Sequence, residues 1–162
     1  MNETEGQLIK GIQTDVQEIW LLVEKGREMI SRLQWLIEAR LGNQIHVLTV
    51  ADYELRLSFY GLPLVVRVEI EYGDRATRGK IIAVQLEYNP ILTMEKERLA
   101  EYSFDYQGKV GDGTHDQLQL DNYALLFLDA VFQKLREKKV RLRPGHKPDL
   151  HEEKRAVGKA AV

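Results

Sequence analysis

The chain contains no cysteine, and this absence removes several classes of site at once. Its 162 residues can form no disulfide, no thiolate metal site and no cysteine nucleophile. The sequence also lacks any run close to the roughly 18 apolar residues that a membrane-spanning helix needs. Its first six residues are polar and acidic, unlike a signal peptide. We therefore expect a cytoplasmic protein with no membrane partner.

Recognisable catalytic motifs are missing as well. The three serines are Ser31, Ser58 and Ser103, and none stands in the Gly-x-Ser-x-Gly turn of a hydrolase nucleophile. Of the four histidines, His146 and His151 lie in a C-terminal segment without rigid support. The formal net charge is only −2, so attraction to nucleic acid would have to come from a local patch. These observations favour a non-enzymatic protein without a cofactor.

An apolar repeat dominates the first quarter of the chain. Its members recur at alternating steps of three and four, which is the seam spacing of a coiled coil. They are Ile9, Ile12, Val16, Ile19, Val23, Gly26, Ile30, Leu33 and Ile37. The pattern predicts a helix over about residues 5–41, about 50 Å long. Because the repeat keeps its phase through Gly26, we expect one long or kinked helix rather than two helices joined by a loop.

Alternating apolar and polar residues follow this helix and predict an antiparallel sheet with one solvated face. The segment 91–100 is interpreted as a connection that can hold a helical turn. The expected strands are Ile45–Val50, Tyr53–Phe59, Val66–Tyr72, Ile81–Tyr88 and Tyr102–Tyr106.

Charged residues predict the register between the second and third of these strands. A tight loop at Gly61 and Leu62 would place Arg56 opposite Arg67, like charge against like. A four-residue loop, 61–64, instead places Arg56 opposite Glu69 and keeps the apolar face intact. We therefore expect the longer loop.

A second amphipathic helix is predicted over about residues 122–138, with Asp121 as its N-cap. The predicted fold class is α+β: a long N-terminal helix, a four- to five-stranded antiparallel meander sheet, and a C-terminal helix on the sheet face that also receives the first helix. The chain divides into a coiled-coil-like amphipathic helix (1–42), an α+β domain completed by the C-terminal helix (43–143) and a flexible charged tail (144–162).

The long helix is the leading candidate site. A strand of typical length spans only about 17–20 Å, so one small sheet covers part of the helix and the rest is expected to meet another chain. The predicted interface residues are Ile9, Ile12, Val16, Ile19 and Val23. We expect a homo-oligomer or a complex with a protein partner, as in an adaptor, a regulator, an inhibitor or a chaperone-like subunit.

Two other patterns leave alternatives open. A basic segment, 134–147, could contact the phosphates of DNA or RNA, although cations also stabilise the C-terminus of a helix. The loop 107–117 could give a small enzyme a divalent-metal or phosphate site, although its residues are also those of an ordinary turn. The candidate phosphate contacts are Lys134, Arg136, Lys138, Lys139, Arg141 and Arg143, and the candidate metal ligands are Asp112, His115 and Asp116.

Overall fold

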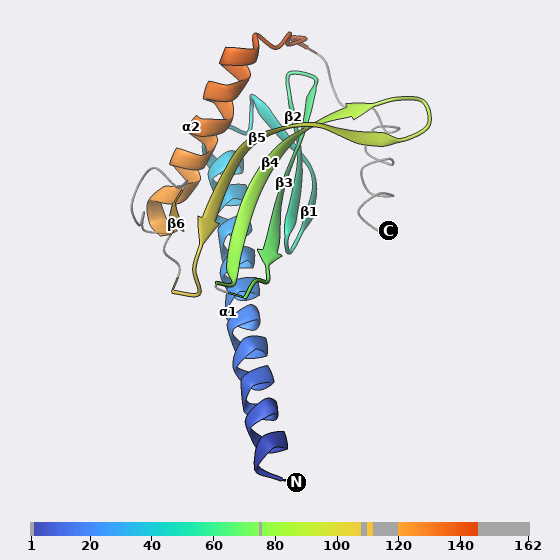
Figure 1. The fold of residues 1–162 in the computed structure, drawn as a ribbon. Helices are drawn as coiled ribbons and strands as arrows, with labels where there is room; N and C mark the ends of the chain where they lie inside the picture. Colours follow the sequence, from blue (N-terminus) through green and yellow to red (C-terminus); the bar gives the residue numbers. More distant parts are fainter. Residues whose placement is uncertain (1, 75, 108–109, 112–119, 146–162) are drawn as a thin grey trace.

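A computed structural model describes residues 2–74, 76–107, 110–111 and 120–145 of the chain. The five long strands form an antiparallel meander in chain order, and the two-residue β6 pairs with β5 at one edge. Figure 1 shows both helices beside this sheet, which confirms the predicted α+β architecture. The elements are α1 (Glu3–Arg40), β1 (Ile45–Ala51), β2 (Glu54–Phe59), β3 (Leu62–Glu71), β4 (Arg78–Tyr88), β5 (Thr93–Phe104), β6 (Val110–Gly111) and α2 (Leu120–Lys138).

The first helix, α1, is continuous through Gly26, as the phase of the repeat predicted. A capping box closes its start: the Glu5 amide donates to the Asn2 side chain at 2.8 Å, and the Glu5 carboxylate accepts from the Asn2 amide at 3.4 Å. Gly26 lies where the helix packs on β3. A Cβ atom at this position would stand 2.6 Å from Cγ1 of Val68. The missing side chain therefore allows helix and sheet to approach closely.

Both helices pack on the same face of the sheet and share one core with it. The buried side chains of α1 begin at Leu22, and they meet buried residues of β2, β3, β4 and β5. The Tyr123 hydroxyl of α2 donates to the main-chain carbonyl of Met29 in α1, which ties the two helices together. Burial raises the pKa of this hydroxyl, so it stays protonated and remains a donor. Helix α2 contributes Tyr123, Ala124, Phe127, Leu128, Val131 and Leu135 to the core.

The start of β5 corrects one expectation. This strand begins at Thr93, inside the segment that was expected to be a connection. Its pairing with β4 has irregularities between Ala83 and Val84 and between Gln85 and Leu86. Glu95 then contacts Arg67 of β3, and Glu97 contacts α2. The local sequence is strongly charged and helix-like, but strand pairing decides its conformation.

The turn between β2 and β3 corrects a second expectation. These strands are joined by two residues, Tyr60 and Gly61, rather than by the expected four. Their φ angles are 47° and 82°, and positive φ at both central residues defines the type I′ turn that suits the twist of a hairpin. In this register Glu54 faces Arg67, and Arg56 faces Val65. The observed register thus also separates like charges, but it pairs Glu54 with Arg67 instead of the predicted Arg56 with Glu69.

The start of α2 differs slightly from expectation too. The helix begins at Leu120, so Asp121 lies in its first turn rather than at the N-cap position. Most of the predicted tail, residues 146–162, lies outside the described residues.

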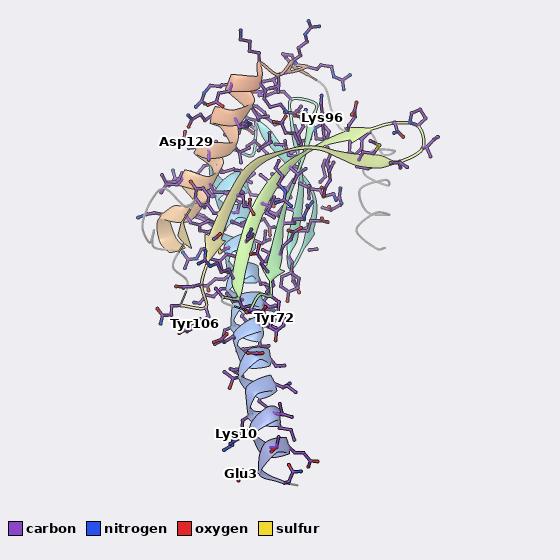
Figure 2. The ribbon with its side chains drawn as sticks, in the orientation of Figure 1. Glu3, Lys10, Tyr72, Lys96, Tyr106 and Asp129 are labelled. Carbon is purple, nitrogen blue, oxygen red and sulfur yellow. The ribbon has the colours of Figure 1, made fainter. Side chains whose placement is uncertain are left out.

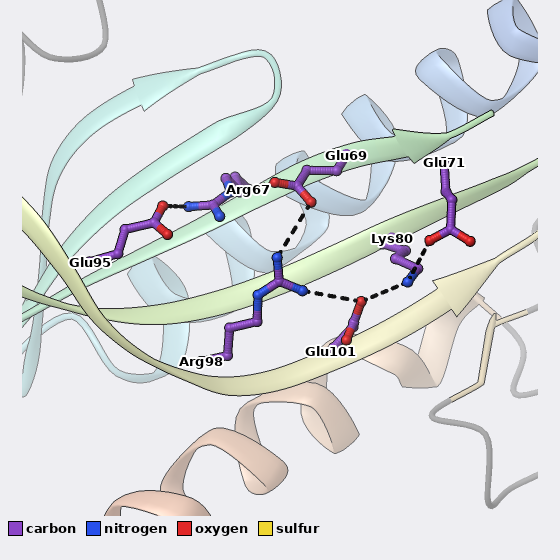
Figure 3. Close-up of polar contacts among 7 residues, drawn as sticks. All are labelled: Arg67, Glu69, Glu71, Lys80, Glu95, Arg98 and Glu101. Atoms are coloured by element: carbon purple, nitrogen blue, oxygen red, sulfur yellow. Dashed lines mark hydrogen bonds and ion pairs between the residues drawn. The ribbon is translucent and has the colours of Figure 1, made fainter. Parts of the chain in front are cut away.

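The sheet face away from the helices carries a network of ion pairs (Figure 3). Its members are Arg67, Glu69, Glu71, Lys80, Glu95, Arg98 and Glu101. Lys80 is central: its Nζ lies 2.8 Å from Glu71 and 3.0 Å from Glu101. The hydrogen bond from Lys80 lowers the pKa of the Glu71 carboxyl. This face is not wholly solvated, because it also holds a small buried cluster of Val65, Ile82, Val84 and Leu86.

Candidate functional site

The N-terminal half of α1 projects beyond the end of the sheet (Figure 1). We call residues 3–20 the overhang, because every side chain in it is exposed or half-buried and burial begins only at Leu22. Figure 2 places Glu3 and Lys10 far from the sheet, whereas Tyr72 at the sheet's end lies beside α1. The Tyr72 hydroxyl donates to the Asp15 carboxylate at 2.6 Å. This bond raises the pKa of Tyr72. It also shows that the last part of the overhang, from Asp15 onward, lies beside the end of β3 without being buried by it.

Large apolar side chains line one face of the overhang and are open to solvent. The exposed fractions are 63% for Leu8, 42% for Ile9, 62% for Ile12, 60% for Val16 and 55% for Trp20. We call these five residues the overhang stripe. Three of the five predicted interface residues, Ile9, Ile12 and Val16, belong to it. The other two, Ile19 and Val23, are half-buried near the sheet's end.

The stripe and the core-facing side of α1 are one continuous apolar face. The spacing of three and four residues continues from Ile9 to Ile37 without a change of phase. The sheet covers this face from Leu22 onward and leaves the preceding part uncovered. The exposed stripe therefore results from a helix that is longer than the sheet it packs on.

The overhang is also a poor helix by composition. It contains Gly6 and Gly11, and a Cβ atom at either position would have no neighbour within 4 Å. Each glycine costs about 1 kcal/mol relative to alanine in a helix interior. Since most helical stability in proteins comes from packing an apolar face, this segment stands to gain from a partner.

The basic segment does not form a uniform cationic surface. Lys134 and Lys138 point toward Glu97 of β5, with Nζ–carboxylate distances of 4.0 and 2.6 Å. Lys138 also donates to the Gln85 side chain at 2.6 Å. The sheet therefore engages two of the six predicted phosphate contacts. The other four, Arg136, Lys139, Arg141 and Arg143, are exposed at and beyond the end of α2.

The predicted metal ligands Asp112, His115 and Asp116 lie outside the described residues. Within the described part of the chain, no group of three or more histidine, aspartate or glutamate side chains is placed to hold a metal ion.

Two hollows adjoin α1. One, of about 740 Å³, lies between α1 and β1 and is lined partly by Glu24, Lys25 and Glu28. Its charged groups form ion pairs along the helix surface, such as Lys25 with Glu28 at 3.5 Å. The other, of about 520 Å³, lies between the helices and is lined by apolar side chains that include Trp35 and Leu125. Neither arrangement resembles the convergent acid, base and nucleophile of a catalytic pocket.

Comparison of the chain with protein-family models, with curated proteins and with solved structures finds no match in any of the three. Among the described residues, no helix is both long enough and apolar enough to cross a membrane. The exposed surface of the structure is therefore the basis for assigning a function.

Proposed function

We propose that the protein is a non-enzymatic interaction module that self-associates through the overhang of α1. Such a chain would serve as an adaptor, a regulator, an inhibitor or a chaperone-like subunit. The observation that carries the proposal is the overhang stripe, in which five large apolar side chains are 42–63% exposed on one helix face. Contiguous apolar surface of this kind is uncommon on monomers and is typical of interaction sites.

The chemistry of the stripe suits another helix. Ile9, Ile12 and Val16 occupy seam positions of the heptad, and β-branched residues at such positions pack well between paired helices. Leu8 and Trp20 flank the seam and widen the apolar face. A groove or helix with complementary side chains would cover all five at once.

The test is the mass of the wild-type protein in solution, measured by light scattering over a series of concentrations. We expect a mass of two chains or more that falls on dilution. A single-chain mass at every concentration would contradict the proposal. Salt-dependent binding to DNA or RNA by such a monomer would instead favour the basic segment as the functional surface.

A further inference from the structure

We infer that the groove between α1 and α2 binds an acidic amphipathic helix of a partner protein. This inference goes beyond the proposed self-association and does not depend on it. The groove has a volume of about 520 Å³ and is lined by the last turns of α1 and the first turns of α2. Arg32, its first lining residue, lies about 18 Å along α1 from Trp20 of the overhang stripe. Chains joined through the overhang would therefore each keep a groove for a partner.

The walls of the groove are apolar and open to solvent. Trp35 of α1 and Leu125 of α2 are 64% and 63% exposed. Trp35 lies two residues from Leu33 and two from Ile37, and both of these are buried. It therefore stands on the face of α1 that points away from the sheet. Large apolar side chains that gather on an exposed face are typical of interaction sites.

The charges that line the groove are all of one sign. Among the described residues that line it, the charged ones are Arg32 and Arg40. They lie about 12 Å apart along the helix axis, with Leu36 midway in the same row of side chains. Arg32 also pairs with Glu28 at 3.7 Å, but both side chains are exposed, and such pairs contribute little. The groove is thus complementary to a segment whose apolar residues are flanked by acidic ones.

The architecture of the groove favours a helical partner. Both walls are α-helices, whose main-chain groups bond within the helix, so the groove offers no sheet edge to an extended peptide. A bound helix satisfies its own main chain and makes contact through side chains. A small ligand such as a lipid is normally enclosed over most of its surface, whereas Trp35 and Leu125 leave this groove open. The expected ligand is a helix with two acidic residues about eight positions apart and apolar residues between them.

Tryptophan fluorescence tests whether this groove is occupied. The chain has two tryptophans, so Trp20→Phe leaves Trp35 as the single reporter in the full-length protein. The probe is a synthetic alanine-based helical peptide of about 20 residues, with two glutamates about eight positions apart and two leucines between them. Matched peptides carry lysine in place of glutamate, or alanine in place of leucine. Since Trp35 is 64% exposed, its emission should move to shorter wavelengths as the glutamate peptide covers it.

Charge reversal tests the role of the two arginines. Arg32→Glu with Arg40→Glu should weaken binding of the glutamate peptide about tenfold and allow the lysine peptide to bind. Leu125→Asp should abolish binding of the glutamate peptide, and circular dichroism checks that the fold persists. Arg136→Glu with Arg141→Glu is the matched control, because these arginines are exposed and lie outside the groove. This control should bind the glutamate peptide as the wild type does.

The remaining outcomes contradict the inference. If the glutamate peptide causes no saturable shift, or if the lysine peptide binds the wild type equally well, the charge complementarity is wrong. Binding detected by calorimetry without a change in Trp35 emission would place the site elsewhere. A shift caused by palmitate but not by the peptide would identify an anionic amphiphile as the ligand, and a shift that depends on protein concentration alone would place a second copy in the groove. Light scattering decides self-association separately, so the two proposals fail independently.

Discussion

Replacing Ile12 and Val16 of the overhang stripe by aspartate is expected to convert the dimer into a folded monomer. The two side chains are 62% and 60% exposed in the single chain, so the substitutions remove no core contact. Isoleucine, valine and aspartate also have similar helix propensities. The half of α1 that begins at Leu22 keeps its packing on the sheet, and the fold should therefore persist.

The magnitude follows from the surface that dimerisation can still bury. Complete burial of an aliphatic side chain contributes about 1.5–3 kcal/mol, so the exposed 60% of each residue represents about 1–2 kcal/mol. Four such side chains meet in a dimer, and their loss weakens association by about 4–7 kcal/mol. This change corresponds to an increase of about 10³–10⁵-fold in the dissociation constant. Desolvation of the new carboxylates would increase it further.

Sedimentation equilibrium and light scattering over a concentration series measure the effect, and circular dichroism checks the fold. Thr14→Asp with Gln17→Asp is the matched control, since it adds the same charge on the opposite face of the same helix. This control should remain dimeric. If the control dissociates to the same degree, the added charge rather than the loss of the stripe causes the dissociation. A monomeric wild-type protein would contradict self-association through the overhang.

Three further predictions concern stability. Gly26→Ala should lower the free energy of unfolding by up to about 2 kcal/mol, because overpacking against Val68 exceeds the gain in helix propensity. Gly11→Ala, which meets no neighbour, should raise the free energy of unfolding by about 1 kcal/mol. Urea unfolding measures both variants, and equal effects would contradict the close approach of helix and sheet. Tyr123→Phe should lower the free energy of unfolding by about 1 kcal/mol in the same assay, since the hydrogen bond to the carbonyl of Met29 is lost. An unchanged urea midpoint would argue against that bond. The hydrogen bond from Lys138 lowers the pKa of Glu97 below its ordinary value of 4.5. The ionised Glu97 therefore contributes its full stabilisation of the folded state above pH 4.5, and this stabilisation is lost as the pH falls through the lowered pKa. Glu97→Gln should therefore flatten the fall in melting temperature at acid pH, and a wild-type-like profile would rule out this linkage.

The helices were predictable because their signals are local. A seam repeat that holds its phase for four heptads specifies both the helix and its apolar face, and Gly26 does not interrupt it. The same holds for α2, in which Ala124, Phe127, Leu128, Val131 and Leu135 recur at helical spacing and are buried in the core, while Leu125 and Leu126 stay exposed. Strands with strict alternation, such as β2, were equally readable.

The sheet's details depend on contacts between distant residues. The charged start of β5 resembles a helical turn in isolation, yet it forms a strand because β4 offers partners for its main chain. The β2–β3 register follows from the backbone of Tyr60 and Gly61, which selects a type I′ turn. Charge pairing across the strands was compatible with more than one register and could not decide between them.

The candidate site shows the same division between local and tertiary information. The sequence determined that α1 is one long helix and that a single face of it is apolar from Ile9 to Ile37, because the period of side chains around a helix is a local property. Only the tertiary structure decided which part of that face is covered. The boundary lies between Asp15, which Tyr72 contacts at the end of the sheet, and Leu22, the first buried side chain of α1. This position depends on how strands from the rest of the chain pack against α1.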